Sequence, residues 1–340
     1  MARAISPLLL VGLVVAACSR AAPPAVPPLP NPSAAEAWTG GEAADTGTMV
    51  ETEMRNVDLH LDSGIVLHIA RLRGRLLPSL PAAPPALDER RSFVLDLHSA
   101  EIAIDTLSLN TLLNRHVFAY PGAAFRDLRV GTDGDQLIER GLIGGGPGIR
   151  FTVRATVAVT PEGQIRLHPT SVKVIGITVN GLMKLFGVQL DQLVRLRPGY
   201  GARLVGNDFI LDPTGVLPPP VIRGHLTGIR VDAGQLAQTF GPIDSAGTAS
   251  LRRPDPAVPN YMYFRHGTLR FGRLTMTDAD LEIDDNDPSD PFAFSLDRYN
   301  DQMVAGYAKG TRDHGLVVHM PDLGRLAPII EAAGPGSPAH

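Results

Sequence analysis

Carboxylate and amide oxygens gather in one short segment of the sequence, Asp284-Asp285-Asn286-Asp287-Pro288-Ser289-Asp290. Hard cations such as Ca²⁺ prefer such oxygens when one tight loop supplies them. The segment nevertheless differs from an EF-hand, because no glycine follows the alternating ligand positions and Leu296 stands where a bidentate glutamate is required. The pattern favours a solvated acidic turn after a strand at 281–283, with a calcium-binding loop as the alternative.

The other polar side chains do not have the spacing of a metal or catalytic site. No His-x-x-x-His pair and no cysteine pair occurs, so we expect exposed strand histidines rather than a zinc site. We find no nucleophile elbow, Ser-x-x-Lys pair or metallohydrolase motif, so the sequence predicts no enzymatic activity and no cofactor. The histidines on predicted strands or near the end of the chain are His60, His68, His98, His266, His314 and His319.

The single cysteine, Cys18, ends a pattern that could carry a covalent lipid. Residues 1–3 give a positive start, and the apolar run at 8–15 is too short to span a bilayer. The run ends in Val15-Ala16-Ala17-Cys18, which resembles the lipobox of bacterial lipoproteins, where the cysteine thiol accepts a diacylglyceryl group. The resemblance predicts a signal peptide over 1–17 and an acylated Cys18 that anchors the chain in a membrane. An ordinary signal peptide that happens to precede a cysteine is the alternative.

The residues after Cys18 indicate where the anchored chain is held. In lipoproteins of double-membrane bacteria an aspartate after the cysteine retains the protein in the inner membrane, and here that position is Ser19. The resemblance therefore implies an exported protein on the periplasmic face of the outer membrane. Residues 18–50 are rich in Ala, Pro and Ser, which predicts a spacer without a packed core.

Composition limits the remaining classes of function. The chain has 340 residues, of which 44% are hydrophobic and 19% charged, with a net charge of −4. Such a chain can bury one large or two modest cores. No block of Lys or Arg forms a stripe for phosphate groups, so nucleic acid is not expected as a partner. The 35 glycines, 30 prolines and low aromatic content favour short strands and turns.

Alternation of apolar and polar residues predicts many strands. In 150–159 the apolar residues fall on one face and Arg or Thr on the other, and 161–163 supply a turn to a second strand from residue 165. In 93–104 the alternation changes phase, which predicts a bulge near Ser99. Similar runs occur at 57–61, 65–72, 202–211 and 222–231.

Other segments have helical spacing. Residues 179–197 predict a long amphipathic helix that ends before Pro198. A shorter helix is predicted over 107–118 with Ser108 as its cap, and one or two helical turns over 235–240. The stripe of the long helix contains Val179, Leu182, Met183, Phe186, Leu190, Leu193 and Val194.

The sequence pattern changes after residue 251. A Pro-rich connector precedes further short strands, which form either a second small domain over 252–323 or an extension of the sheet in the preceding domain at 51–251. The tail at 324–340 is expected to be flexible. The strands are predicted at 261–271, 274–283, 292–296, 303–308 and 316–320.

The order of these elements is similar to that of tubular lipid-binding (TULIP-like) proteins, especially the LmeA-type and YceB-type envelope proteins. The similarity covers residues 55–231 and includes the short helix, the hairpin at 150–174, the amphipathic helix and the run from Gly201 to Pro213. It implies an α+β fold in which a strongly curved antiparallel sheet wraps a long amphipathic helix, with a C-terminal β-rich extension.

The same resemblance implies a function, because in that family an apolar groove takes the acyl chains of lipids. We therefore expect a membrane-anchored envelope lipoprotein that binds or shuttles phospholipid or another acyl lipid. The alternative is a structural or partner-binding lipoprotein with a fully packed sheet and no ligand. The expected lipid contacts are Phe151, Val153, Leu182, Met183, Phe186, Leu190 and Leu193.

Overall fold

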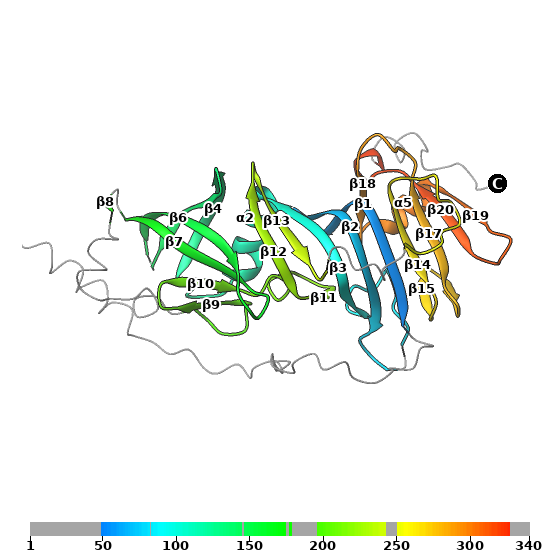
Figure 1. Cartoon of the computed structure of the whole chain (residues 1–340), viewed down its shortest axis with the longest axis horizontal. Coiled ribbons are helices and arrows are strands. Elements are labelled where there is room, and N and C mark those ends of the chain that lie inside the picture. Colours follow the sequence, from blue (N-terminus) through cyan, green and yellow to red (C-terminus); the bar gives the residue numbers. More distant parts are fainter. Residues whose placement is uncertain are drawn as a thin grey trace, which may run out of the picture.

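The computed structural model of the chain describes residues 49–81, 83–144, 146–174, 177–178, 196–242 and 250–326. Strands dominate these residues and form an 11-stranded sheet, a seven-stranded sheet and a two-stranded ribbon. Figure 1 shows the seven-stranded sheet at one end of an elongated molecule and the last strands of the chain at the other end.

The 11-stranded sheet joins the first and the last thirds of the described chain. Its members are β1 (Val50–Asp62), β2 (Ile65–Pro78), β3 (Phe93–Asp105), β11 (Val221–Arg223), β12 (Leu226–Asp232), β13 (Gln235–Phe240), β14 (Tyr261–Arg265), β17 (Asp280–Asp285), β18 (Phe292–Ser295), β19 (Tyr307–Gly310) and β20 (Leu316–Met320). The strand order is β12-β13-β3-β2-β1-β14-β17-β20-β19, while β11 pairs with β3 and β18 pairs with β1. The strands after residue 260 thus continue the sheet that the first strands begin.

The seven-stranded sheet is inserted between β3 and β11 in the chain. It consists of β4 (Phe125–Asp133), β5 (Gln136–Ile143), β6 (Ile149–Val159), β7 (Ile165–Val174), β8 (Ile177–Thr178), β9 (Ala202–Val205) and β10 (Asp208–Leu211). Its order is β4-β5-β6-β7-β10-β9, with β8 paired to β7. The ribbon contains β15 (Leu269–Phe271) and β16 (Leu274–Met276).

The helices of the described residues are short. They are α2 (Thr106–Leu112) with a π-helical turn (Leu113–Val117), α5 (Tyr299–Ala305) and a 3-10 turn (Leu323–Arg325). The predicted helix over 107–118 is confirmed, but its cap is Asp105, whose carboxylate accepts a hydrogen bond from the backbone N–H of Ser108. Asn110 and Asn114 then fix the helix to β4 through hydrogen bonds to its backbone at Leu128 and Val130.

The predicted α+β class is wrong, because the described residues form an all-β type of fold with no long amphipathic helix among them. The core explains the difference. Strands supply most of the fully buried side chains, including Phe264, Phe292 and Phe294, so one part of the bent sheet packs on another. Among the described residues, side chains of strands therefore fill this core, and a wrapped helix does not. The predicted helix over 179–197 lies outside the described residues except for 196–197, which are not helical.

The pairing partner of β1 changes along the length of the strand. Its first half pairs with β14, its second half pairs with β18, and Asn56 lies between the two halves. Asn56 has a φ of 52°, a left-handed conformation that asparagine tolerates better than most residues. Its side-chain amide donates to Asn260 Oδ1 over 2.7 Å, which joins the bend to the residue before β14.

The local strand predictions are more accurate than the predicted fold class. The predicted bulge near Ser99 is confirmed, because Arg73 pairs with Ser99 and Gly74 with Leu97, so that His98 is left out of the ladder. Two local predictions are wrong. Residues 235–240 form β13 rather than helical turns, since they pair with β3 along their whole length. Residues 303–308 contain the end of α5 and the start of β19.

Candidate functional site

One face of the seven-stranded sheet is apolar, and two of the expected lipid contacts lie on it. Phe151 in β6 pairs with Gly141 and Val174, and Val153 pairs with Glu139 and Val172. Phe151 is buried, whereas Val153 is only partly buried. The partly buried apolar side chains that continue this face are Val157, Val159, Leu167, Leu204, Phe209 and Leu211.

An aromatic cluster occupies one end of this face. The ring of Phe125 lies 5.4 Å from that of Phe118, 5.5 Å from that of Phe151 and 5.8 Å from that of Phe209. Phe151 therefore packs against aromatic side chains of the protein itself. Leu196, the first described residue after the gap at 179–195, also packs on this cluster.

The other expected site residues cannot be placed. Leu182, Met183, Phe186, Leu190 and Leu193 lie outside the described residues, and so does Cys18. The described chain resumes beside the aromatic cluster, where the backbone N–H of Arg197 donates to the Tyr120 hydroxyl over 3.2 Å. The guanidinium of Arg197 also lies 5.5 Å from the ring centre of Tyr200.

Glu139 is a titratable group on the apolar face that the sequence analysis did not single out. It stands opposite Val153 on β6 and Val130 on β4. The residue is partly buried, and removal of its carboxylate from water raises its pKa to about 7. The carboxylate has no hydrogen bond or ion pair with another residue of the described ranges. The sequence signal for this residue is its position between Leu137 and Gly141, in a strand whose apolar and polar residues alternate.

The opposite face of the same sheet carries cations. Register places Arg140 beside Arg129 and Thr152, and Thr152 beside Lys173, while Ala158 lies beside Arg166. The sequence has no block of Lys or Arg here, but strand pairing gathers on this face cations that are separated in the sequence. The cations on it are Arg129, Arg140, Arg150, Arg154, Arg166, Lys173 and Arg203.

Few of these cations are neutralised. Arg154 forms an ion pair with Asp133, and Arg203 donates to Gln164 Oε1 over 2.6 Å. Within the described ranges, no carboxylate forms an ion pair with the remaining five cations of this face. These five side chains are exposed. The sheet therefore has one apolar face and one cationic face.

A small apolar cavity lies between the 11-stranded sheet and residues 213–217, which follow β10. Its volume is about 10 Å³, and its lining includes Leu67, Leu97 and Ile102. Ligand pockets commonly have volumes of about 300–1,000 Å³. The cavity has room for about one water molecule and none for an acyl chain.

The expected solvated acidic turn begins later than residue 284, because residues 286–290 form a largely exposed turn whereas Asp284 and Asp285 continue the strand. Asp284 and Asp285 end β17 and are buried, with exposed fractions of 0% and 5%. Burial, followed in size by the charge of Glu282, raises the pKa of Asp284 to about 8. Glu282 is also buried and pairs with Arg253 over 2.5 Å, so β17 ends with three buried carboxylates.

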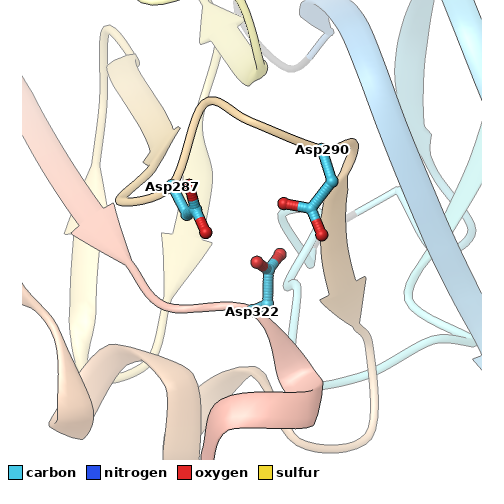
Figure 2. A group of neighbouring side chains, drawn as sticks. All are labelled: Asp287, Asp290 and Asp322. Atoms are coloured by element: carbon cyan, nitrogen blue, oxygen red, sulfur yellow. The ribbon is translucent and has the colours of Figure 1, made fainter.

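The turn after β17 contributes to a cluster of three carboxylates, which Figure 2 shows. Asp287 and Asp290 belong to the turn, and Asp322 follows β20. One oxygen from each carboxylate lies within 4.8 Å of the others. Asp322 is buried, and this burial raises its pKa to about 6. Asp322 lies 32 residues beyond Asp290, so the sequence around the acidic turn does not indicate that it belongs to the cluster.

The helices of the described residues lack the length and apolar character that a membrane span requires. Comparison of the chain with protein-family models, with curated proteins and with solved structures finds no match. The resemblance to tubular lipid-binding proteins therefore stays a prediction, and a proposal about function has to rest on the geometry of this chain.

Proposed function

We propose that this protein is a membrane-anchored envelope lipoprotein whose seven-stranded sheet binds the acyl chain of a lipid on its apolar face. The observation that carries the proposal is the row of partly buried apolar side chains along β6, β7 and β10, which includes Val153, Val157 and Phe209. Apolar surface that a monomer leaves incompletely covered commonly marks a binding groove or an interface.

The chain around the gap at 179–195 supports this location. Val174, which ends β7, pairs with Phe151, and Leu196 packs on the same aromatic cluster. The described residues Val174 and Leu196, on either side of the gap, therefore both lie at the apolar face.

The cationic face supports an encounter with a membrane. Lys and Arg near an anionic bilayer surface each contribute about 1 kcal/mol of attraction. Five exposed cations without an ion pair to the described carboxylates would hold the sheet against anionic headgroups, from which an acyl chain could be taken. The net charge of the whole chain is −4, so it does not indicate the positive potential of this one face.

The anchor completes the proposal. An acylated Cys18 would fix the chain to the membrane, and the Pro- and Ala-rich residues between Cys18 and β1 would let the folded part reach its surface. We expect Cys18→Ser to abolish incorporation of labelled fatty acid into the protein in cells. Retained labelling would contradict acylation at this position.

Binding of N-phenyl-1-naphthylamine, an uncharged probe that fluoresces in apolar surroundings, tests the binding face. We expect Val153→Asn to weaken binding at least fivefold, because Val153 lies on the apolar face. The matched control is Val205→Asn, since Val205 is 53% exposed and shares the cationic face with Arg203. Equal probe binding by both variants, with unchanged circular dichroism, would contradict the proposal.

A second candidate is a structural or partner-binding lipoprotein. It is favoured by the dense packing of the 11-stranded sheet, whose cavity of about 10 Å³ cannot hold a ligand, and by Phe151, which packs against the protein's own rings. Crosslinking in intact cells that traps one protein partner, together with no probe binding, would favour this candidate.

A further inference from the structure

We propose that Asp287, Asp290 and Asp322 bind a hard divalent cation, and that calcium is the ion that fits best. The inference is independent of lipid binding, because these residues belong to the 11-stranded sheet and its connections. Two ligands come from the turn between β17 and β18, and the third comes from the segment after β20.

The distances match those of a cation site. Carboxylate oxygens that share one Ca²⁺ at about 2.4 Å are separated by at most about 4.8 Å. One oxygen of each of the three carboxylates meets this limit. Figure 2 shows the three side chains converging from two segments of the chain.

Asp322 has one buried carboxylate oxygen that lacks a hydrogen-bond donor among the described residues. The residue is 6% exposed, and one of its carboxylate oxygens, Oδ1, accepts a hydrogen bond from the backbone N–H of Ala293 over 2.7 Å. The other oxygen, Oδ2, is buried and accepts no hydrogen bond from any described group. The carboxylate points toward Asp287 and Asp290 in Figure 2. A buried carboxylate oxygen without a donor is strongly unfavourable, and a bound cation would remove that cost.

Arg325 is the described cation that stands against the cluster. Its guanidinium contacts Asp287 Oδ2, while its Nε lies 3.9 Å from Asp322 Oδ2. One guanidinium against three carboxylates leaves two negative charges, which a divalent ion would balance. The Arg325 side chain is 57% exposed and can move into water when an ion enters.

The ligand chemistry selects the class of ion. The cluster contains carboxylates and no His or Cys side chain, so it suits a hard cation rather than zinc. Ca²⁺ accepts six to eight oxygens in irregular geometry and can take the remaining ones from water, whereas Mg²⁺ requires a near-ideal octahedron. Three carboxylates from two separate segments therefore favour calcium.

Hydrogen bonds already hold the ligand turn in shape. The Asp287 N–H donates to Asp285 Oδ1 over 2.8 Å, and the Ser289 hydroxyl donates to Asp287 Oδ1 over 2.7 Å. The amide of Asn260 donates to the backbone carbonyl of Asp290. An ion bound here would tie this turn to the end of β20 and so stabilise the last third of the sheet.

Isothermal titration of the metal-free chain with CaCl₂, with terbium luminescence as a second readout, tests the site. We expect saturable binding of one ion and a rise in Tm with calcium that EDTA reverses. Asp290→Asn should weaken binding at least tenfold without loss of fold, because the exposed Asp290 side chain makes no hydrogen bond to the described residues. Asp313→Asn, an exposed aspartate in the turn between β19 and β20, is the matched control.

Two further results separate the proposal from a merely acidic surface. Arg325→Gln should strengthen calcium binding severalfold, because it removes the competing guanidinium. MgCl₂ should bind at least tenfold more weakly than CaCl₂. No saturable calcium binding, or equal binding by Asp290→Asn and Asp313→Asn, would overturn the proposal.

Discussion

At the scale of single residues, burial changes the pKa values of three carboxyl groups of this protein. Burial raises the pKa of Glu139 to about 7, that of Asp284 to about 8 and that of Asp322 to about 6. The three groups lie in different settings: an apolar sheet face, the interior beside Arg253 and Glu282, and the carboxylate cluster. From each setting we predict a different response, either to pH or to ions.

Asp284→Asn should change how stability depends on pH. In the folded protein Asp284 keeps its proton up to about pH 8, whereas in the unfolded chain it loses the proton near the ordinary aspartate pKa of 3.8. The unfolded chain therefore binds fewer protons between these values, so this group lowers stability as pH rises. We expect the variant to match the parent protein near pH 4 and to have a higher Tm at pH 8, by roughly 2–4 °C for each kcal/mol recovered.

The control for this experiment is Asp278→Asn, since the Asp278 side chain is 84% exposed. Its Tm profile should run parallel to that of the parent protein from pH 4 to pH 8. Parallel profiles for Asp284→Asn as well would show that Asp284 is ionised in the folded protein.

Glu139 should make binding of an apolar probe to this face depend on pH. With a pKa of about 7, Glu139 is mainly neutral at pH 6 and mainly charged at pH 8. A charge on the apolar face opposes burial of a hydrocarbon, so N-phenyl-1-naphthylamine should bind more tightly at pH 6. Glu139→Gln should bind the probe equally at both values. A pH dependence that persists in this variant would assign it to another group.

At the scale of elements, Gly141 in β5 leaves room for Leu128 of β4 and Phe151 of β6. A Cβ at Gly141 would lie 2.7 Å from Leu128 Cδ2 and 3.1 Å from Phe151 Cε1. Gly141→Ala should therefore destabilise the protein by about 1–3 kcal/mol through overpacking. The free energy of unfolding in urea measures this change. Gly131→Ala in β4 is the control, because a Cβ there has no atom within 4 Å, and a similar loss in both variants would contradict the argument.

Elements with a local signal could be predicted from the sequence. The hairpin at 150–174, the helix at 107–118 and the bulge near Ser99 depend on alternation or spacing within a few residues, and all three are confirmed. Residues 235–240 contain Gln, Leu and Ala, which favour a helix locally, but pairing with β3 and β12 makes them a strand.

The site residues that sequence reasoning missed depend on contacts between distant segments. Glu139 and the cations of the seven-stranded sheet meet only through strand register, and Asp322 joins Asp287 only because β20 pairs with β17. The fold class was wrong for the same reason. The apolar residues of the strands after residue 260 cover the sheet that begins at β1, and no local pattern shows this.

At the scale of the whole molecule, the seven-stranded sheet forms one end of an elongated body, as Figure 1 shows, and its cationic face is exposed. Charge reversal of two unpaired cations, Arg140→Glu with Arg150→Glu, should weaken sedimentation with phosphatidylglycerol vesicles at least tenfold at low salt. Reversal of Arg312, which is exposed in the turn between β19 and β20, should have little effect. Equal losses would contradict a membrane-facing role for this sheet.

The proposed function requires that the apolar face of the seven-stranded sheet bind a hydrocarbon chain. Native mass spectrometry of the full chain, purified in several mild detergents, measures such binding. We predict a population heavier than the protein without bound lipid by the mass of one lipid molecule, and its loss in Val153→Asn but not in Val205→Asn. Only the lipid-free mass under every condition would contradict lipid binding and favour a structural or partner-binding role.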